Sequence, residues 1–307
     1  MKPLREAIHD YLTLRRSVGF RLRQAEIGLR SFASFLEAKG ADHITTALAL
    51  AWATQGTTHQ PATWAEQLTF VRGFARHWSA IDPRTEVPPG GLLPFRPRRA
   101  RPYLYTAGEI QRLLAAAQAL PPLRGETYAC LFGLLAVTGL RISEALALTP
   151  PDVDLRAGVL TIRQGKFGKS RLVPLHASTQ RALAAYARQR AAWLRGRPAP
   201  TFLVSDRGRP LEISTVRRTV YALSRQASLR GPSDHHGPRL HDFRHRFAVE
   251  TLVRWYRAGH DVERRLPTLA TYLGHAHVTD TYWYLSACPA LLGLAKGRME
   301  RRWEAWP

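Results

Sequence analysis

The sequence predicts a mainly α-helical protein with a small antiparallel β-sheet. Apolar residues recur at spacings of three and four through most of the chain, which is typical of helices that bury one face. Two short apolar segments, 159–162 and 171–174, are separated by a glycine-containing turn and are expected to pair as strands. A stretch rich in Pro, Gly and Arg divides the chain, so we expect two domains, 1–90 and 103–307, joined by a basic linker at 91–102.

The first domain is expected to be a small helical bundle. Its first apolar stripe begins at Leu4 and continues to Leu14. A second run extends from Arg23 to Ala38 and stops before Gly40, and a third amphipathic segment extends from Trp64 to Trp78.

The second domain is expected to combine helices with the sheet. A capping-box pattern at 106–109 predicts the start of its first helix. A further short strand is expected at 201–204. Helices are expected at 125–137, 142–148, 178–194 and, in several pieces, from 213 to 304, the last of them forming a C-terminal tail.

Charge is the strongest signal in the composition of this 307-residue chain. Lys and Arg number 45 against 23 Asp and Glu, a formal net charge of +22, of which residues 96–307 carry +19. Such a surplus repels itself in a folded protein unless a polyanion offsets it, and nucleic acid is the obvious polyanion. The alternative is an arginine-rich composition that only reflects the base composition of the genome.

Other features limit the class of protein. No stretch of about 18 uncharged apolar residues occurs, so no membrane span is expected. The N-terminus lacks the apolar core of a signal peptide. Cys130 and Cys288 form no Cys-x-x-Cys pair and are expected to be free thiols in a reducing compartment. We therefore expect a cytoplasmic protein without a membrane partner.

The placement of arginine and lysine suggests particular contacts. The linker cluster suits a strap across a phosphate backbone, although a solvated linker has the same composition; it consists of Arg96, Arg98, Arg99 and Arg101. The chain has only five lysines, and an ammonium can release a proton where a guanidinium cannot. Lys166 and Lys169 lie together in the turn between the strands, so this turn is a candidate for acid–base chemistry.

Four short segments of the second domain carry residues suited to phosphate chemistry. Taken singly, they are typical of a surface ion pair, a solvated turn, a structural histidine and a packing tyrosine. These separate explanations do not account for the occurrence of all four segments in this order in one domain. In chain order they contain Arg141 with Glu144, Lys166, His241 with Arg244, and His275 followed nine residues later by Tyr284.

This order resembles that of the tyrosine recombinase, or phage integrase, family of site-specific DNA recombinases. The likeness covers about 103 to 290, and the first domain resembles the core-binding domain of that family. It implies a mixed α+β catalytic domain of the tyrosine recombinase type. It also implies catalytic roles for Arg141, Lys166, His241, Arg244, His275 and Tyr284, a supporting role for Glu144, and DNA contacts from Lys169 and the linker arginines.

The resemblance further implies a reaction and an assembly. DNA strands would be cleaved and rejoined through a covalent 3′-phosphotyrosine, with no cofactor and no metal, during integration, excision, transposition or resolution. Lys166 would protonate the leaving 5′ oxygen, and His241 would act as a base or bind the phosphate. Double-stranded DNA would be bound by a dimer per site and a tetramer in the synapse. The C-terminal segment would pack on a neighbouring protomer, or else close its own domain.

Several alternatives stay open at the level of sequence. Tyr282 and Tyr284 point about 200° apart on a helix, so only one can face the site, and the spacing from His275 favours Tyr284. Lys169 competes with Lys166 for the role of acid. Twelve histidines would suit a metal-dependent nuclease, but neither His-Glu-x-x-His nor Cys-x-x-Cys occurs. A DNA-binding protein with an inactive recombinase fold is the remaining alternative.

Overall fold

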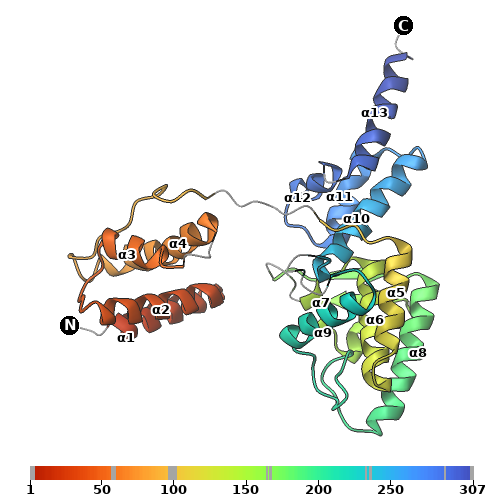
Figure 1. Ribbon diagram of the computed structural model, residues 1–307, viewed down its shortest axis with the longest axis horizontal. Coiled ribbons are helices and arrows are strands. Elements are labelled where there is room, and N and C mark those ends of the chain that lie inside the picture. Colours follow the sequence, from red (N-terminus) through yellow and green to blue (C-terminus); the bar gives the residue numbers. More distant parts are fainter. Residues whose placement is uncertain are drawn as a thin grey trace. The chain divides into compact units, whose positions relative to one another are not determined.

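The computed structural model describes residues 4–56, 60–95, 102–163, 165, 168–231, 234, 237–286 and 288–304. The chain divides into two compact units, Met1–Ala100 and Arg101–Pro307, and each is described by itself (Figure 1). The predicted linker arginines at 96–101 lie outside the described residues. No helix within the described ranges has the length and apolar character needed to cross a bilayer.

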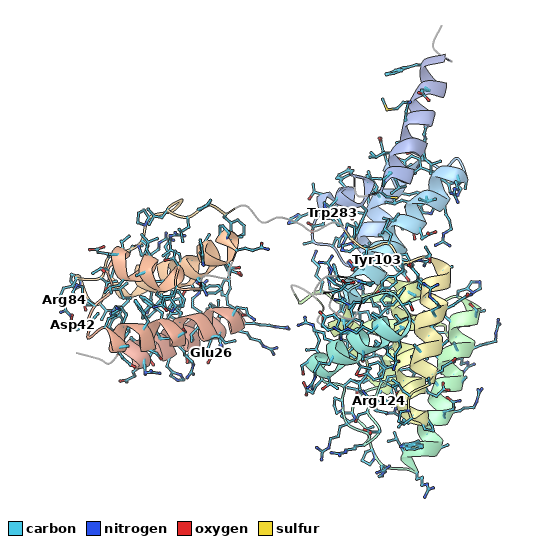
Figure 2. The ribbon with its side chains drawn as sticks, in the orientation of Figure 1. Glu26, Asp42, Arg84, Tyr103, Arg124 and Trp283 are labelled. Atoms are coloured by element: carbon cyan, nitrogen blue, oxygen red, sulfur yellow. The ribbon has the colours of Figure 1, made fainter. Side chains whose placement is uncertain are left out.

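The described residues of the first unit form the helices α1 (Leu4–Ser17), α2 (Arg23–Ala38), α3 (Thr46–Ala53) and α4 (Pro61–Trp78). Their apolar faces meet in a core whose innermost side chains are fully buried, namely Leu29, Phe32, Val71 and Phe74. Arg84 binds Asp42 over 2.7 Å and so ties the segment after α4 to the loop before α3 (Figure 2).

Helix α3 was not predicted, because its sequence TALALAWA is apolar on nearly every side and shows no stripe. Its start is nevertheless marked by a cap, since the Thr45 side chain accepts a hydrogen bond from the Leu48 amide over 3.2 Å. A helix of this length that is buried by its neighbours gives no periodic signal of its own.

The second unit contains a three-stranded antiparallel sheet in the order β1–β2–β3. Strands β2 (Val159–Ile162) and β3 (Arg171–Pro174) have the predicted bounds, and Ile162 pairs with Arg171. Strand β1 (Val153–Asp154), preceded by the 3-10 turn Pro150–Asp152, was not predicted because two residues carry no alternation. The register places Arg171 at the end of the ladder nearest the β2–β3 turn.

Helices surround this sheet and form the main core of the second unit. They are α5 (Ala107–Gln118), α6 (Pro122–Thr138), α7 (Ile142–Ala147), α8 (Ala177–Leu194), α9 (Ile213–Gln226) and α10 (Leu240–Arg257). Helix α6 packs against α5, α8 and α10. Phe243 of α10 stacks between Tyr105, at 4.5 Å, and Phe132 of α6, at 6.1 Å. This stack fixes the first turn of α10 against α6.

The strand predicted at 201–204 is wrong. The segment makes only an isolated bridge between Val204 and Pro210. Its backbone amides bond elsewhere, since that of Phe202 donates to the Leu148 carbonyl over 2.7 Å and that of Val204 donates to the Tyr186 hydroxyl over 3.3 Å. The short apolar run is thus a buried loop, whose pattern resembles that of a buried strand.

The last three helices, α11 (Val262–Leu273), α12 (Thr279–Ser286) and α13 (Pro289–Glu304), share a second core with α10. Helix α13 packs on α10 and α12 through its first turns, where Leu291 is buried. Its other end projects away from the unit (Figure 1), and Trp303 there is 70% exposed. Helix α13 therefore closes its own domain at one end and offers a free surface at the other.

Gly139 provides a test of how α6 is joined to the segment that follows it. It ends α6 with φ +62°, and a Cβ there would lie 2.6 Å from Cδ1 of Phe247. We expect Gly139→Ala to lower the free energy of unfolding by about 2 kcal/mol or more, through backbone strain and overpacking. Urea denaturation measures the change.

Gly133→Ala is the matched control, because Gly133 lies inside α6 and a Cβ there meets nothing within 4 Å. It should raise stability by about 0.5–1 kcal/mol. Equal effects at the two positions would show that the left-handed turn at Gly139 is not required.

Candidate active site

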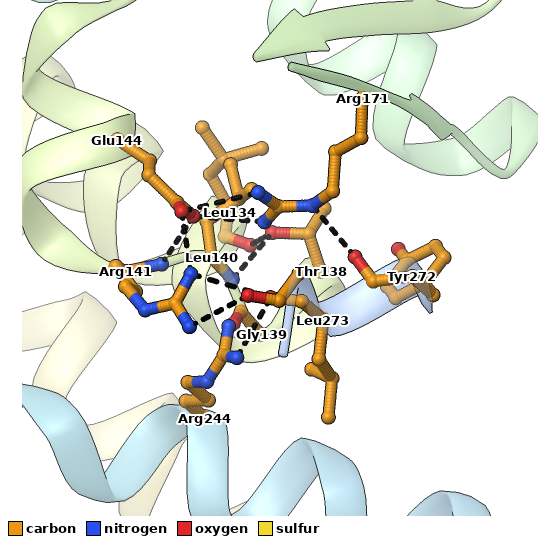
Figure 3. A network of polar contacts seen from close by, with 11 residues as sticks. Leu134, Thr138, Gly139, Leu140, Arg141, Glu144, Arg171, Arg244, Tyr272 and Leu273 are labelled. Carbon is orange, nitrogen blue, oxygen red and sulfur yellow. Dashed lines mark hydrogen bonds and ion pairs between the residues drawn. The ribbon is translucent and has the colours of Figure 1, made fainter. Parts of the chain in front are cut away.

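Two predicted arginines, Arg141 and Arg244, meet beside the last turn of α11 (Figure 3). Arg141 precedes α7 and donates from Nη2 to the Gly274 carbonyl over 2.9 Å. Arg244 of α10 donates from Nη2 to the Leu273 carbonyl over 2.7 Å and from Nη1 to the Gly139 carbonyl over 2.9 Å. These bonds hold the C-terminal ends of α6 and α11 and the N-terminal end of α7 close together.

Glu144 is held between two guanidinium groups. Nη1 of Arg141 donates to its Oε1 over 2.8 Å, and Arg171 donates from Nη1 and Nη2 to Oε1 and Oε2 over 3.1 and 2.8 Å. Burial alone raises the pKa of Glu144, but the hydrogen bonds from Arg171 and from Arg141 outweigh it and lower the pKa to about 2. The carboxylate is therefore ionised at neutral pH and fixes both arginines.

Arg244 is a cation already removed from water. Its side chain is almost fully buried, at 1% exposure. Burial and the nearby charge of Arg141 lower its pKa to about 10, while Tyr284 and Glu144 act in the opposite direction. The guanidinium still carries its charge at neutral pH, so a ligand would meet it without desolvating it further.

Tyr284 lies in this cluster, whereas Tyr282 does not. Tyr284 is 3% exposed and its ring stacks on that of His275 at 6.0 Å, while Tyr282 is 48% exposed. Burial raises the pKa of the Tyr284 hydroxyl, and the charge of Arg244 with a hydrogen bond from it partly reverses that rise. Of the two tyrosines, only Tyr284 is buried beside Arg244 and Arg141.

His275 follows the glycine that ends α11. Its Nδ1 lies 2.7 Å from the Oγ1 of the buried Thr281, and burial together with Arg244 and Arg141 lowers its pKa to about 4. The ring is therefore neutral at neutral pH. A proton donated by Thr281 to Nδ1 leaves the ring proton on Nε2, where it can be donated to a ligand.

His241 lies in the first turn of α10 and is exposed to solvent. The protein groups packed around its ring and the charge of Arg244 lower its pKa to about 4. Its ring contacts that of His245 edge-on at 4.6 Å, and His245 in turn contacts Tyr284 at 5.5 Å. His241 is thus joined to the tyrosine through one intervening ring.

The remaining predicted residues lie elsewhere or outside the described residues. Lys166 and the linker arginines belong to the latter group. Lys169 is exposed in the β2–β3 turn, where its carbonyl accepts a hydrogen bond from the Gly165 amide over 2.8 Å. Among the described residues, no three His, Cys, Asp or Glu side chains are grouped as a metal site requires.

The sequence motifs did not indicate Arg171, nor that His245 is buried between His241 and Tyr284. Alternation along β3 could have indicated Arg171, because it shares a face with Val173, which is fully buried. A charged residue on the inner face of a strand needs a partner. His245 lies four residues after His241, a spacing that places both rings on one side of α10.

Comparison with known proteins is consistent with this geometry. A model of the phage integrase family matches residues 104–289. The chain is 55% identical over 311 residues to a Sinorhizobium fredii protein named integrase/recombinase y4rB, with 99% of both chains covered. It is 34% identical over 225 residues to tyrosine recombinase XerD of Caulobacter vibrioides, covering 73% of this chain and 70% of that protein.

Solved structures share the fold. The integrase of transposon Tn1549, in complex with transposon right end DNA, has a TM-score of 0.68 at 18% identity and covers 98% of this chain and 99% of its own. A lambda integrase dimer bound to a core site has a TM-score of 0.59 at 20% identity, over 90% and 96% of the two chains. The predicted fold class, mainly helical with a small antiparallel sheet, is confirmed.

The two histidines give the site a pH dependence that can be measured. The pKa values of His241 and His275 are lowered to about 4 from an ordinary 6.5, so the folded chain binds fewer protons than the unfolded chain between these values. The free energy of unfolding should therefore be highest above pH 6.5 and should fall as the pH drops to 4. Replacing both by asparagine should make this fall smaller in urea denaturation. An equal fall in the two proteins would contradict the lowered pKa values.

Proposed function

The chain belongs to the phage integrase family of tyrosine recombinases, and we propose that it cleaves and rejoins double-stranded DNA with Tyr284 as the nucleophile. The observation that carries this assignment is the buried cluster that Tyr284 forms with Arg244, Arg141 and His275. The Tyr284 oxygen forms a bond to phosphorus, and the bond from phosphorus to the 5′ oxygen breaks. The phosphodiester energy is kept in the 3′-phosphotyrosine, which a second 5′-hydroxyl then attacks.

The two arginines are suited to the charge that develops in this reaction. Each guanidinium has five N–H donors; in Arg244, each Nη atom donates to one backbone carbonyl, and a further hydrogen bond goes to Tyr284. Donors therefore remain for the non-bridging oxygens of a phosphate, which Arg141 and Arg244 would clamp together. Because both side chains are already fixed by carbonyls and Glu144, little reorganisation accompanies the reaction.

The proton steps fall to the histidines and a lysine. His241 is neutral at neutral pH and would accept the Tyr284 proton or bind the phosphate, and His275 would donate from Nε2 to a non-bridging oxygen. The leaving 5′ oxygen needs a proton. Lys166 would supply it from the β2–β3 turn, a role that an arginine cannot easily fill.

DNA binding and assembly extend the proposal to the rest of the chain. The first unit would serve as the core-binding domain, and Lys169 with the linker arginines would contact phosphates in the cytoplasm. A lambda integrase has been solved as a dimer on a core site and as a tetramer on a Holliday junction. A dimer per site and a tetramer in the synapse are proposed here too. The exposed apolar residues of α13 would contact a neighbouring protomer; they are Leu292, Met299 and Trp303.

Two tyrosine variants test the nucleophile. The substrate is a set of nicked duplexes with randomised arms. Cleavage near the nick releases a short strand that diffuses away, so its 5′-hydroxyl cannot rejoin the DNA and the covalent protein–DNA adduct accumulates. The adduct survives denaturing electrophoresis and is measured there. Tyr284→Phe should form no adduct, since the attacking oxygen is absent. Tyr282→Phe is the matched control and should form as much adduct as the unaltered protein. Adduct from Tyr284→Phe would overturn the assignment.

A second pair of variants tests the proton donor. Lys166→Arg should slow single-turnover cleavage by about a hundredfold or more while DNA affinity is kept, because arginine preserves the charge but not the acid. Lys169→Arg, in the same turn, should cleave at the normal rate. Equal rates for the two variants would remove Lys166 from this role.

A further inference from the structure

Arg171 makes contacts that reach beyond its own strand. Its two Nη atoms bind Glu144, and its Nε donates to the Tyr272 carbonyl over 2.8 Å. Its side chain is 11% exposed. It is not among the residues to which the family resemblance assigns a catalytic or supporting role.

One side chain therefore joins three elements of the pocket (Figure 3). Arg171 belongs to β3, Glu144 to α7, and Tyr272 to the last turn of α11. Glu144 is the acidic partner of Arg141, and His275 comes directly after that last turn. The guanidinium of Arg171 thus binds both Glu144, which holds Arg141, and the end of α11, which precedes His275.

Gly274 shows how closely Arg171 packs on this turn. A Cβ at Gly274 would lie 2.7 Å from Nη1 and 3.0 Å from Cζ of Arg171. Gly274 also has φ +70°, a conformation that glycine adopts most readily. The glycine before His275 therefore serves both the left-handed turn and the close approach of the guanidinium.

We propose that Arg171 is a positioning residue for DNA cleavage, which holds Arg141 and His275 at a fixed separation by binding Glu144 and the Tyr272 carbonyl together. This inference rests on the proposed function, because the separation matters only if both groups contact the same phosphate. Displacement by about 1 Å of a group that binds the reacting phosphate can cost about a hundredfold in rate.

The shape of arginine explains why lysine would not serve equally well. The planar fork directs both Nη atoms to the carboxylate and Nε to the carbonyl at the same time. An ammonium at this position could pair with Glu144 but could not make all three bonds with one fixed plane. Arg171→Lys should therefore keep the ion pair and lose the link to α11.

The first experiment compares Arg171→Gln and Arg171→Lys with Arg163→Gln, using the nicked duplexes with randomised arms. Arg163 is the matched control because it also lies beside the sheet and binds a buried carboxylate, that of Asp152, over 2.7 Å. At a temperature where circular dichroism shows each variant folded, single-turnover cleavage at saturating DNA should fall about a hundredfold in Arg171→Gln and about tenfold in Arg171→Lys. Arg163→Gln should cleave normally, and all three should keep their DNA affinity.

The outcomes separate this proposal from the function on which it rests. If the unaltered protein forms no adduct, the proposed function fails and the inference fails with it. If the unaltered protein forms adduct and both Arg171 variants cleave normally, only the inference is overturned. A loss of DNA affinity equal to the loss of cleavage would also overturn it, as would a similar loss in Arg163→Gln. If Arg171→Gln does not fold, Arg171→Lys decides alone.

The pH dependence of the cleavage rate gives a further test, because a general loss of rigidity would lower the rate at every pH without changing its pH dependence. The charged groups facing Glu144 are Arg171, Arg141 and Arg244. Without Arg171, burial of Glu144 is opposed by fewer hydrogen bonds and its pKa should rise, so cleavage by Arg171→Gln should begin to decline at a higher pH than cleavage by the unaltered protein. Adding Glu144→Gln should abolish this decline, because it removes the carboxylate that titrates. A parallel profile in Arg171→Gln and the unaltered protein would contradict the proposal.

Discussion

The pocket depends on the bonds between arginine side chains and the carbonyls that end α11. The last carbonyls of a helix have no partner within it and carry partial negative charge, which favours cations nearby. Here the carbonyls of Tyr272 and Gly274 accept from Arg171 and Arg141, and that of Leu273 accepts from Arg244 over 2.7 Å and from Arg141 over 3.5 Å. Within the part of the chain that the structure describes, Glu144 is the one carboxylate bonded to any of the three arginines, so the cluster keeps a surplus of positive charge in a poorly hydrated space. A phosphate is the ligand that such a surplus favours.

Burial and that surplus of positive charge together determine the protonation of the surrounding side chains. Arg244 contributes to the lowered pKa of both His241 and His275, so the two rings stay neutral where an isolated histidine would be partly charged. It acts on Tyr284 in the sense that favours ionisation, against the effect of burial. The same cations that would bind the phosphate therefore also leave one histidine as an acceptor and the other as a donor.

The sequence predicted those parts of the fold whose signal is local. The bounds of α2, β2 and β3 follow from stripes and alternation that each segment carries itself. Helix α3 and the loop at 201–204 were not predicted correctly, because burial by distant residues determines them. The order of motifs indicated the residues that gather around Arg244. It did not indicate Arg171, whose partners Glu144 and Tyr272 lie 27 and 101 positions away in the chain.

If Tyr284 is the nucleophile, as proposed, its burial has two opposite effects on its reactivity. A tyrosine that is 3% exposed is protected from competing reactions, yet its raised pKa keeps the hydroxyl protonated at neutral pH. Under the proposed function, the scissile phosphate would accept hydrogen bonds from Arg244 and Arg141. The phosphate would also place the neutral His241 within the same set of contacts, so that loss of the tyrosine proton and attack on phosphorus would occur only when DNA completes the pocket.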